Sequence, residues 1–162
     1  MKLIVSDTTS LIVLDELKSL DLLCRLFECV LIPEAVFSEL QVGSPAVKAT
    51  LEKAGCFELI TLENSEQLLS LKLVLDAGES EAIALAVERK LPVLIDERKG
   101  RQIARQLKLT VTGFAGILIL AVRKDVLSAD EAIALMDQAM NNGYCLSEKL
   151  YRQVVDTLKE LS

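Results

Sequence analysis

The stretch that decides the fold is LIVSDTTSLIVL, residues 3–14, in which one carboxylate and several hydroxyls separate two apolar runs. The first run has the length of a short buried strand, and the second continues into a helical pattern. The stretch therefore predicts a strand over residues 3–6 followed at once by a helix over residues 8–17. A charge between two buried segments is costly unless it is compensated. Asp7 thus requires either backbone hydrogen bonds or a bound cation.

The rest of the chain repeats this alternation of short apolar strands with helices. Further strands are expected at 30–32, 57–61, 92–95 and 110–111, and further helices at 20–27, 33–42, 46–54, 65–75, 79–90, 98–107, 114–123, 128–140 and 147–161. Such alternation indicates a parallel sheet covered by helices on both faces. We therefore expect an α/β fold, a three-layer α/β/α sandwich with a mostly parallel central sheet and additional C-terminal helices.

A length of 162 residues fits a single domain. We expect one domain over residues 1–162, with its core at about 1–125 and a C-terminal helical extension at about 126–162. The longest clean apolar stretch, 114–122, is far shorter than the roughly 20 residues that span a bilayer. The N-terminal apolar run is interrupted by acids, unlike a signal peptide. These features predict a cytoplasmic protein that does not enter a membrane.

The chain has no histidine. This excludes Ser-His-Asp and Cys-His nucleophilic sites, imidazole metal sites and the commonest general base. Catalysis would therefore use carboxylates, which select hard cations such as Mg²⁺ or Mn²⁺. The four cysteines, Cys24, Cys29, Cys56 and Cys145, have neither the spacing of a zinc or redox site nor the density of a disulfide scaffold. We interpret them as free, buried apolar side chains.

Several acids lie where one edge of the expected sheet would be. Open parallel sheets bind ligands beyond the carboxyl ends of their strands. Asp7 follows the first strand, and Asp96 and Glu97 follow the fourth. Glu39 lies two turns into the helix after the second strand, and Glu79 begins an Ala-rich helix on its apolar face.

These acids have two interpretations. Taken singly, Asp7 can cap the next helix and Glu79 can favour a helix N-terminus, each a stabilisation of about 0.5–2 kcal/mol. Taken together, carboxylates about 4 Å apart repel by roughly 4 kcal/mol at an effective dielectric constant of about 20. A divalent cation would remove that penalty, so the acids form a metal site if their segments meet in space. Glu81 shares a face with Glu88 and is expected to be solvated.

The net charge of −6 argues against a general coating of nucleic acid, because non-specific affinity comes from Lys and Arg. Residues 97–108 are a local exception. This segment contains Arg98, Lys99, Arg101, Arg105 and Lys108. It has two interpretations, a patch that binds phosphates and the solvated face of a helix.

Four motifs occur in a characteristic order: SDTTSL after the first strand, IPEAVFSEL after the second, GESEAIALA on a central helix and LIDERKGR after a later strand. Together they resemble the PIN domain over about residues 1–125, in particular its small prokaryotic branch related to the VapC toxins. The resemblance implies a ribonuclease that depends on Mg²⁺ or Mn²⁺ and hydrolyses RNA phosphodiester bonds. It also implies the toxin of a toxin–antitoxin pair, with an antitoxin protein as partner.

Carried over residue by residue, the resemblance gives a set of candidate roles. Asp7 matches the family's first acid, with Ser10 or Thr8 as the accompanying hydroxyl. Glu79 stands where the family usually has Asp, with Glu81 as a competitor. The implied metal ligands are Asp7, Glu39, Glu79 and Glu97. The catalytic set adds Asp96, which competes with Glu97, and the substrate-binding set is Ser10, Arg98, Lys99 and Arg101.

Other classes of function fit parts of the same sequence. A haloacid-dehalogenase-type phosphatase also has an Asp after its first strand, but it needs a second Asp where this chain has Thr9. A catalytically inactive PIN-like module that binds nucleic acid or protein is the main alternative. The apolar helix 114–123 and the C-terminal helices offer a surface for a homodimer or another partner, although core packing explains that helix equally well.

Overall fold

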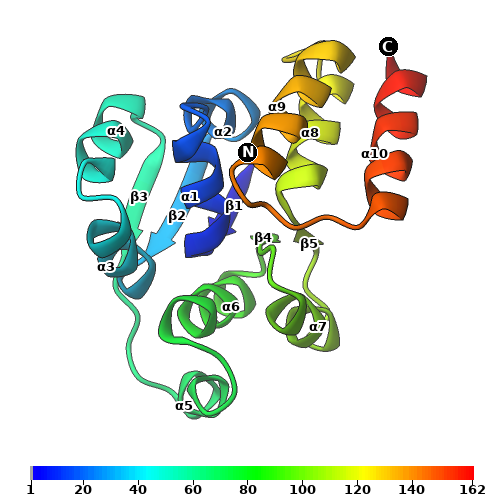
Figure 1. Ribbon diagram of the computed structural model, residues 1–162. Helices are drawn as coiled ribbons and strands as arrows, with labels where there is room; N and C mark the ends of the chain where they lie inside the picture. The colour runs from blue at the N-terminus through cyan, green and yellow to red at the C-terminus, as the bar shows by residue number, and fades with distance from the viewer. Residues whose placement is uncertain (1) are drawn as a thin grey trace.

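The computed structural model describes residues 2–162 of the chain. Its centre is a five-stranded sheet in which each paired strand is parallel to its neighbour (Figure 1). The strands lie in the order β3-β2-β1-β4-β5. Their bounds are β1 Leu3–Ser6, β2 Cys29–Pro33, β3 Phe57–Ile60, β4 Val93–Leu94 and β5 Val111–Thr112.

Every helix and strand expected from the sequence is present, with ends that differ by a few residues. Pro33 is the last residue of β2 and the N-cap of α3, not the first helical residue as predicted. The helices are α1 Thr8–Glu16, α2 Asp21–Leu26, α3 Glu34–Gly43, α4 Val47–Ala54, α5 Glu66–Lys72, α6 Ala77–Arg89, α7 Arg98–Gln106, α8 Phe114–Arg123, α9 Ala129–Asn141 and α10 Glu148–Leu161.

The three central strands, β2, β1 and β4, are buried on both faces, in two separate apolar clusters. Successive side chains of a strand point to opposite sides of the sheet, and Ile4 and Val5 accordingly belong to different clusters. The first cluster is covered by α1 to α4 and α8 to α10, and the second by α5, α6 and α7. This arrangement confirms the predicted α/β/α sandwich, with a sheet that is parallel throughout the described residues.

The strand order reverses between β1 and β4. From the central β1 the chain winds outward to β2 and β3, and then returns to the opposite side of β1 to form β4 and β5. Ligands of open parallel sheets bind in the crevice at such a switch point, beyond the carboxyl ends of the strands. Asp7 follows β1 and Asp96 follows β4 closely, so the fold brings both acids to that point.

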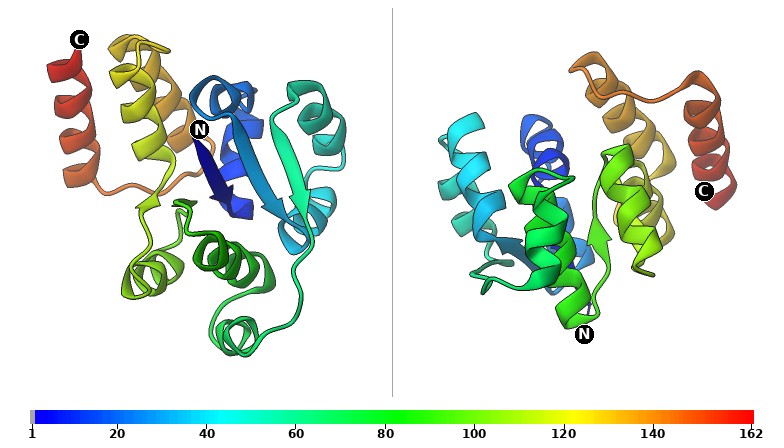
Figure 2. Two further views of the ribbon diagram at one scale, coloured as in Figure 1. Left: turned by 180° about the vertical axis from the view of Figure 1, so that it is seen from behind. Right: turned by 90° about the horizontal axis from the view of Figure 1, so that it is seen from below.

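The last three helices pack side by side at one end of the sheet (Figures 1 and 2). The linker between α9 and α10 crosses the carboxyl end of β4 on its way to the outermost helix (Figure 1). Among residues 2–162, no helix combines the length and the apolar character that a bilayer crossing would need.

The cysteines depart from the expectation of four free side chains. Cys24 and Cys56 form a disulfide that ties α2 to the start of β3, while Cys29 and Cys145 are free. The expectation was wrong for the bonded pair because a separation of 32 residues gives no short motif. The parallel pairing of β2 with β3 is what brings the two together. The expectation of burial was also wrong, because Cys145 is exposed and the other three cysteines are half-buried.

Candidate active site

Asp7 lies in the turn where β1 passes into α1. Its backbone N–H donates to Leu94 O of β4 at 3.0 Å, which fixes the residue beside the neighbouring strand. Its side chain caps α1, with Oδ1 accepting from Ser10 N at 3.1 Å. The capping interpretation of Asp7 is therefore correct for one of its two oxygens.

The second carboxylate oxygen of Asp7 is buried and unpaired among the described residues. The residue is 1% exposed, and its Oδ2 has no hydrogen-bond partner among the described residues. Burial raises the pKa of Asp7 to about 7, against the opposing effect of the Ser10 hydrogen bonds. A carboxylate oxygen in this position is costly in the ionised form and needs a cation or a proton.

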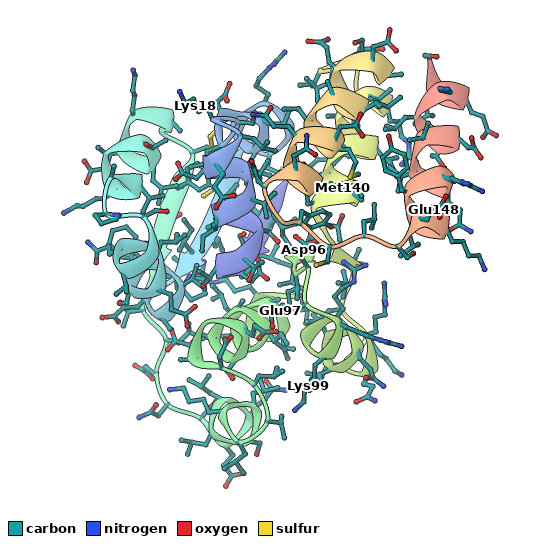
Figure 3. All side chains as sticks on the ribbon, viewed as in Figure 1. Lys18, Asp96, Glu97, Lys99, Met140 and Glu148 are labelled. Atoms are coloured by element: carbon teal, nitrogen blue, oxygen red, sulfur yellow. A yellow bond between two sulfur atoms is a disulfide. The ribbon has the colours of Figure 1, made fainter. Side chains whose placement is uncertain are left out.

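A second group of acids surrounds the start of α6. One carboxylate oxygen each from Asp76, Glu79 and Glu97 lies within 4.8 Å of the others. Asp76 is the N-cap of α6 and accepts from Glu79 N at 2.8 Å, and Glu97 is the N-cap of α7. Figure 3 shows Glu97 and Asp96 between the α6–α7 pair and the C-terminal helices. Two helix starts therefore place their acids against each other.

Glu79 is the buried member of this group. Burial is the main reason that its pKa is raised to about 9, and the neighbouring Asp76 and Glu97 carboxylates add to the effect. Glu79 Oε2 is buried without a partner among the described residues. Gly100 in the first turn of α7 makes room for it, because a Cβ at that position would overlap this oxygen. With a Cβ at this position the Glu79 carboxylate would have to move.

Glu39 connects α3 to the same region. Its two oxygens accept hydrogen bonds from the Thr8 hydroxyl and from Gly78 N, the latter at 3.0 Å. A Cβ at Gly78 would lie 2.6 Å from Glu39 Oε2 and 2.9 Å from Thr8 Oγ1, so this contact also needs glycine. The half-buried Glu39 carboxylate is thereby fixed between α1 and the start of α6.

Both carboxylate oxygens of Asp96 accept hydrogen bonds, whereas Asp7 and Glu79 each have one buried oxygen without a partner among the described residues. Asp96 Oδ1 accepts from Phe114 N at 3.0 Å and from the Tyr144 hydroxyl at 2.8 Å, and its Oδ2 accepts from the Ser10 hydroxyl at 2.7 Å. Three donors from three elements therefore hold this carboxylate. Its negative charge also contributes to the raised pKa of Asp7.

The sequence was compared with known protein families and structures. The model of a family described as DUF3368, PIN domain, matches residues 3–160. This chain belongs to the PIN domain family. A solved PilT N-terminus domain protein from the hyperthermophilic archaeon Sulfolobus solfataricus P2 is similar at 16% identity, with a TM-score of 0.49, covering 72% of this chain and 90% of that one. None of the curated proteins compared with the chain matches it.

Membership confirms the resemblance drawn from the four motifs. PIN domains are typically metal-dependent nucleases with an acidic cluster that binds a divalent metal, and this PIN domain has such a group of acids. The family match extends beyond residue 125, where the sequence resemblance ended, and includes α9 and most of α10.

The structure separates the competing acids of this PIN domain. Glu79 lies in the acidic group, whereas Glu81 accepts from Ala35 N at 3.1 Å at the start of α3. Glu81 is half-buried, so the expectation that it is solvated was wrong. Its hydrogen bond across the α3–α6 contact could not be read from helical periodicity. Glu97 joins the group directly, while Asp96 is held by its three donors.

The hydroxyls after β1 divide between different acids. Ser10 donates to Asp96, Thr8 donates to Glu39, and Thr9 donates to Glu97 Oε1 at 3.3 Å. Both candidates for the accompanying hydroxyl therefore donate to acids of the site, Ser10 to Asp96 and Thr8 to Glu39. This threonine–serine run links three of the predicted acids through α1.

Two residues of the site were missed by the sequence reasoning. Asp76 was taken only as part of a helix break, although its position three residues before Glu79 is a capping spacing that could have revealed it. Tyr144 lies in the α9–α10 linker without any motif around it. Its role follows only from the packing of that linker across β4.

The basic residues at the start of α7 have different environments. Arg98 and Lys99 are exposed. Arg101 is half-buried, and its Nη1 donates to Ile95 O at 2.8 Å. One of the three predicted substrate-binding cations thus also supports the end of β4.

Proposed function

We propose that this PIN domain is a ribonuclease that hydrolyses RNA phosphodiester bonds with Mg²⁺ or Mn²⁺. The observation that carries the proposal is a pair of buried carboxylate oxygens, Asp7 Oδ2 and Glu79 Oε2, without partners among the described residues. Asp7 follows β1 at the switch point of the parallel sheet, and Glu79 belongs to the acidic group with Asp76 and Glu97 at the start of α6. Buried carboxylates are ordinarily paired or bound to metal.

The donor set fits a hard divalent cation. Asp76, Glu79 and Glu97, whose oxygens lie within 4.8 Å of one another, would hold it. Asp7 and Glu39, which lie outside that group, are the further candidates, and all of these ligands are oxygens, as Mg²⁺ and Mn²⁺ prefer. When bound, the cation would lower the pKa of water and neutralise the charge that develops on the phosphate. Thr8 keeps the Glu39 carboxylate in place, and Ser10 does so for Asp96.

The chain supplies no histidine for proton transfer, so the proposed hydrolysis uses the carboxylates alone. In the metal-free protein the raised pKa of Glu79 lets it hold a proton near neutral pH, and a bound cation would displace that proton. Arg98 and Lys99 follow Glu97 directly in the sequence and are exposed, and they would bind the phosphates of the RNA.

A thermal melt tests metal binding without a choice of substrate, because a ligand that binds only the folded state raises the midpoint. We expect Mn²⁺ to raise the midpoint of the wild type relative to EDTA, and Glu79→Gln to lose most of that response. Glu88→Gln is the matched control, since Glu88 is exposed on the same helix. An equal response of both variants would contradict the metal site.

Hydrolysis itself is tested with a mixed set of RNA strands in Mn²⁺. The wild type and Glu88→Gln should cleave them, and Asp7→Asn and Glu79→Gln should not. Metal binding without cleavage of any strand would favour the alternative, a catalytically inactive module that binds nucleic acid or protein.

The biological setting that the resemblance implies is a toxin whose antitoxin partner is encoded nearby. Under this proposal, expression of the wild type in bacteria arrests growth and expression of Asp7→Asn does not. Growth that is unaffected by an RNA-cleaving wild type would contradict the toxin role and leave the ribonuclease proposal intact.

A further inference from the structure

A cavity of about 1070 Å³ lies beside the acidic group. It is formed by α7, the start of α8, the α9–α10 linker and α10, on the side of the molecule where these elements surround the ends of β4 and β5 (Figure 1). Asp96, the residue before Glu97 of the acidic group, is among the residues that line it. Its volume is just above the usual range of ligand sites, about 300–1,000 Å³.

One wall of this cavity is basic. Arg98, Arg101 and Arg105 of α7 line it. Arg98 and Arg105 are exposed, and neither takes part in a salt bridge within residues 2–162. The carboxylate of Asp96 already accepts three hydrogen bonds. The three arginines outnumber this one carboxylate, so the cavity is a locally basic site in a chain with a net charge of −6.

The opposite wall is apolar. Leu146 of the linker and Leu150 and Val154 of α10 line it, and Leu150 is 49% exposed. Tyr144 also lines the cavity. An inorganic anion would contact only the arginines of the basic wall. A ligand that carries both negative charges and flat apolar groups would contact the basic wall and the apolar wall. Single-stranded nucleic acid is such a ligand, since its phosphates bind cations and its bases pack on apolar and aromatic side chains.

We infer that this cavity binds the single-stranded part of an RNA next to the bond that is cleaved, with phosphates on Arg98 and Arg105 and a base against Leu150. The choice of RNA over an acidic polypeptide rests on the proposed function, because Asp96, which lines the cavity, is next in the chain to Glu97 of the acidic group. Arg105, Leu150 and the α9–α10 linker thereby become determinants of substrate binding. Arg101 keeps its hydrogen bond to Ile95 O and supports the wall.

The test is equilibrium binding of a fluorescein-labelled single-stranded RNA in EDTA, measured by anisotropy, so that no hydrolysis occurs. We expect Arg98→Gln/Arg105→Gln to weaken binding at least tenfold. The slope of log K against log salt should fall by about 1.4, because each phosphate contact on a single strand contributes about 0.7. Arg89→Gln/Arg123→Gln is the matched control, since both arginines are exposed and neither lines the cavity.

A second pair of variants tests the apolar wall. Leu150→Glu places a charge in the cavity and should weaken RNA binding at least fivefold. Leu161→Glu makes the same change at the end of the same helix, outside the cavity, and should not. Circular dichroism of all four variants checks that they are folded as the wild type.

Several results would overturn the inference. The arginine pair could bind RNA as tightly as its control, poly-glutamate could displace the RNA at a similar concentration, or a DNA strand of the same sequence could bind more tightly than RNA. A cleavage assay of the same RNA in Mn²⁺ separates this inference from the proposed function. Cleavage with no effect of either cavity variant refutes the cavity alone, and binding that is lost in the cavity variants without cleavage refutes the hydrolysis alone.

Discussion

The hydroxyl of Tyr144 donates a hydrogen bond of 2.8 Å to Oδ1 of Asp96, across a separation of 48 residues. The tyrosine ring also packs edge-on against Phe114, with 5.2 Å between the ring centroids. Burial and the Asp96 carboxylate raise the pKa of Tyr144, so the hydroxyl remains a proton donor at any ordinary pH. The α9–α10 linker, whose residues line the cavity, is thereby fixed to the end of β4.

Replacement of Tyr144 by Phe removes this hydrogen bond and keeps the ring. We expect the free energy of unfolding, measured in urea, to fall by about 1–3 kcal/mol, since hydrogen bonds to charged groups are the stronger ones. Tyr151→Phe is the control, because its hydroxyl bonds Asp137 at an exposed site. Equal losses in the two variants would show that the Tyr144 hydrogen bond has no special weight.

The buried Asp7 predicts an unusual pH dependence in metal-free protein. Its pKa is about 7 in the folded state and near 3.8 when unfolded. Between these values the folded state binds more protons than the unfolded state, so stability falls as the pH rises through this window. The contribution of Asp7 to the free energy of unfolding is complete only below about pH 4, and a few kcal/mol of it are lost by about pH 7.

Asp7→Asn removes that titration and keeps a side-chain oxygen to accept from Ser10 N. In EDTA at pH 8 we expect the variant to be more stable than the wild type, and at pH 4 the advantage should disappear. Urea unfolding at the two pH values measures both. A variant that is less stable than the wild type at pH 8 would show that Asp7 acts as a helix cap and nothing more.

Gly78→Ala tests the contact between α6 and Glu39. The added Cβ would lie 2.6 Å from Glu39 Oε2, closer than atoms tolerate, so the carboxylate must move. We expect a loss of about 1–3 kcal/mol and a smaller Mn²⁺-induced rise in the melting midpoint. The control is Gly43→Ala, whose Cβ would have its nearest neighbour at 3.9 Å, and which should be neutral or slightly stabilising. A normal Mn²⁺ response in Gly78→Ala would remove Glu39 from the metal site.

The order of elements and the sheet edge where the acids gather were predictable from local patterns. Apolar runs of strand length, separated by helices, leave few alternatives to a parallel sheet, and the residue after each strand then lies at a known edge. Asp7, Asp96 and Glu97 were placed by this argument alone. The predicted bounds of the helices lie within a few residues of the observed ones, and a capping box such as Ser128 with Glu131 marks where a helix begins.

What the sequence did not reveal depends on contacts between distant segments. Asp96 is held by hydrogen bonds from Ser10, Phe114 and Tyr144, whereas Glu97 belongs to the acidic group. The local sequence around Asp96 and Glu97 gives no sign of this difference between them. The cavity likewise exists only because α10 packs across from α7. The distinction between adjacent residues with the same charge therefore needed the tertiary structure.

The disulfide between Cys24 and Cys56 provides the last prediction, because it closes a loop with a sequence separation of 32 residues. The chain-entropy model gives a stabilisation of about 3–4 kcal/mol for a loop of this length. We expect dithiothreitol to lower the urea midpoint of the wild type, and Cys24→Ala/Cys56→Ala to have the lower midpoint with or without reductant. Cys29→Ala/Cys145→Ala changes only the free cysteines and should respond to dithiothreitol as the wild type does. A wild type whose midpoint is the same in oxidising and reducing buffer would show that the bond adds nothing to stability.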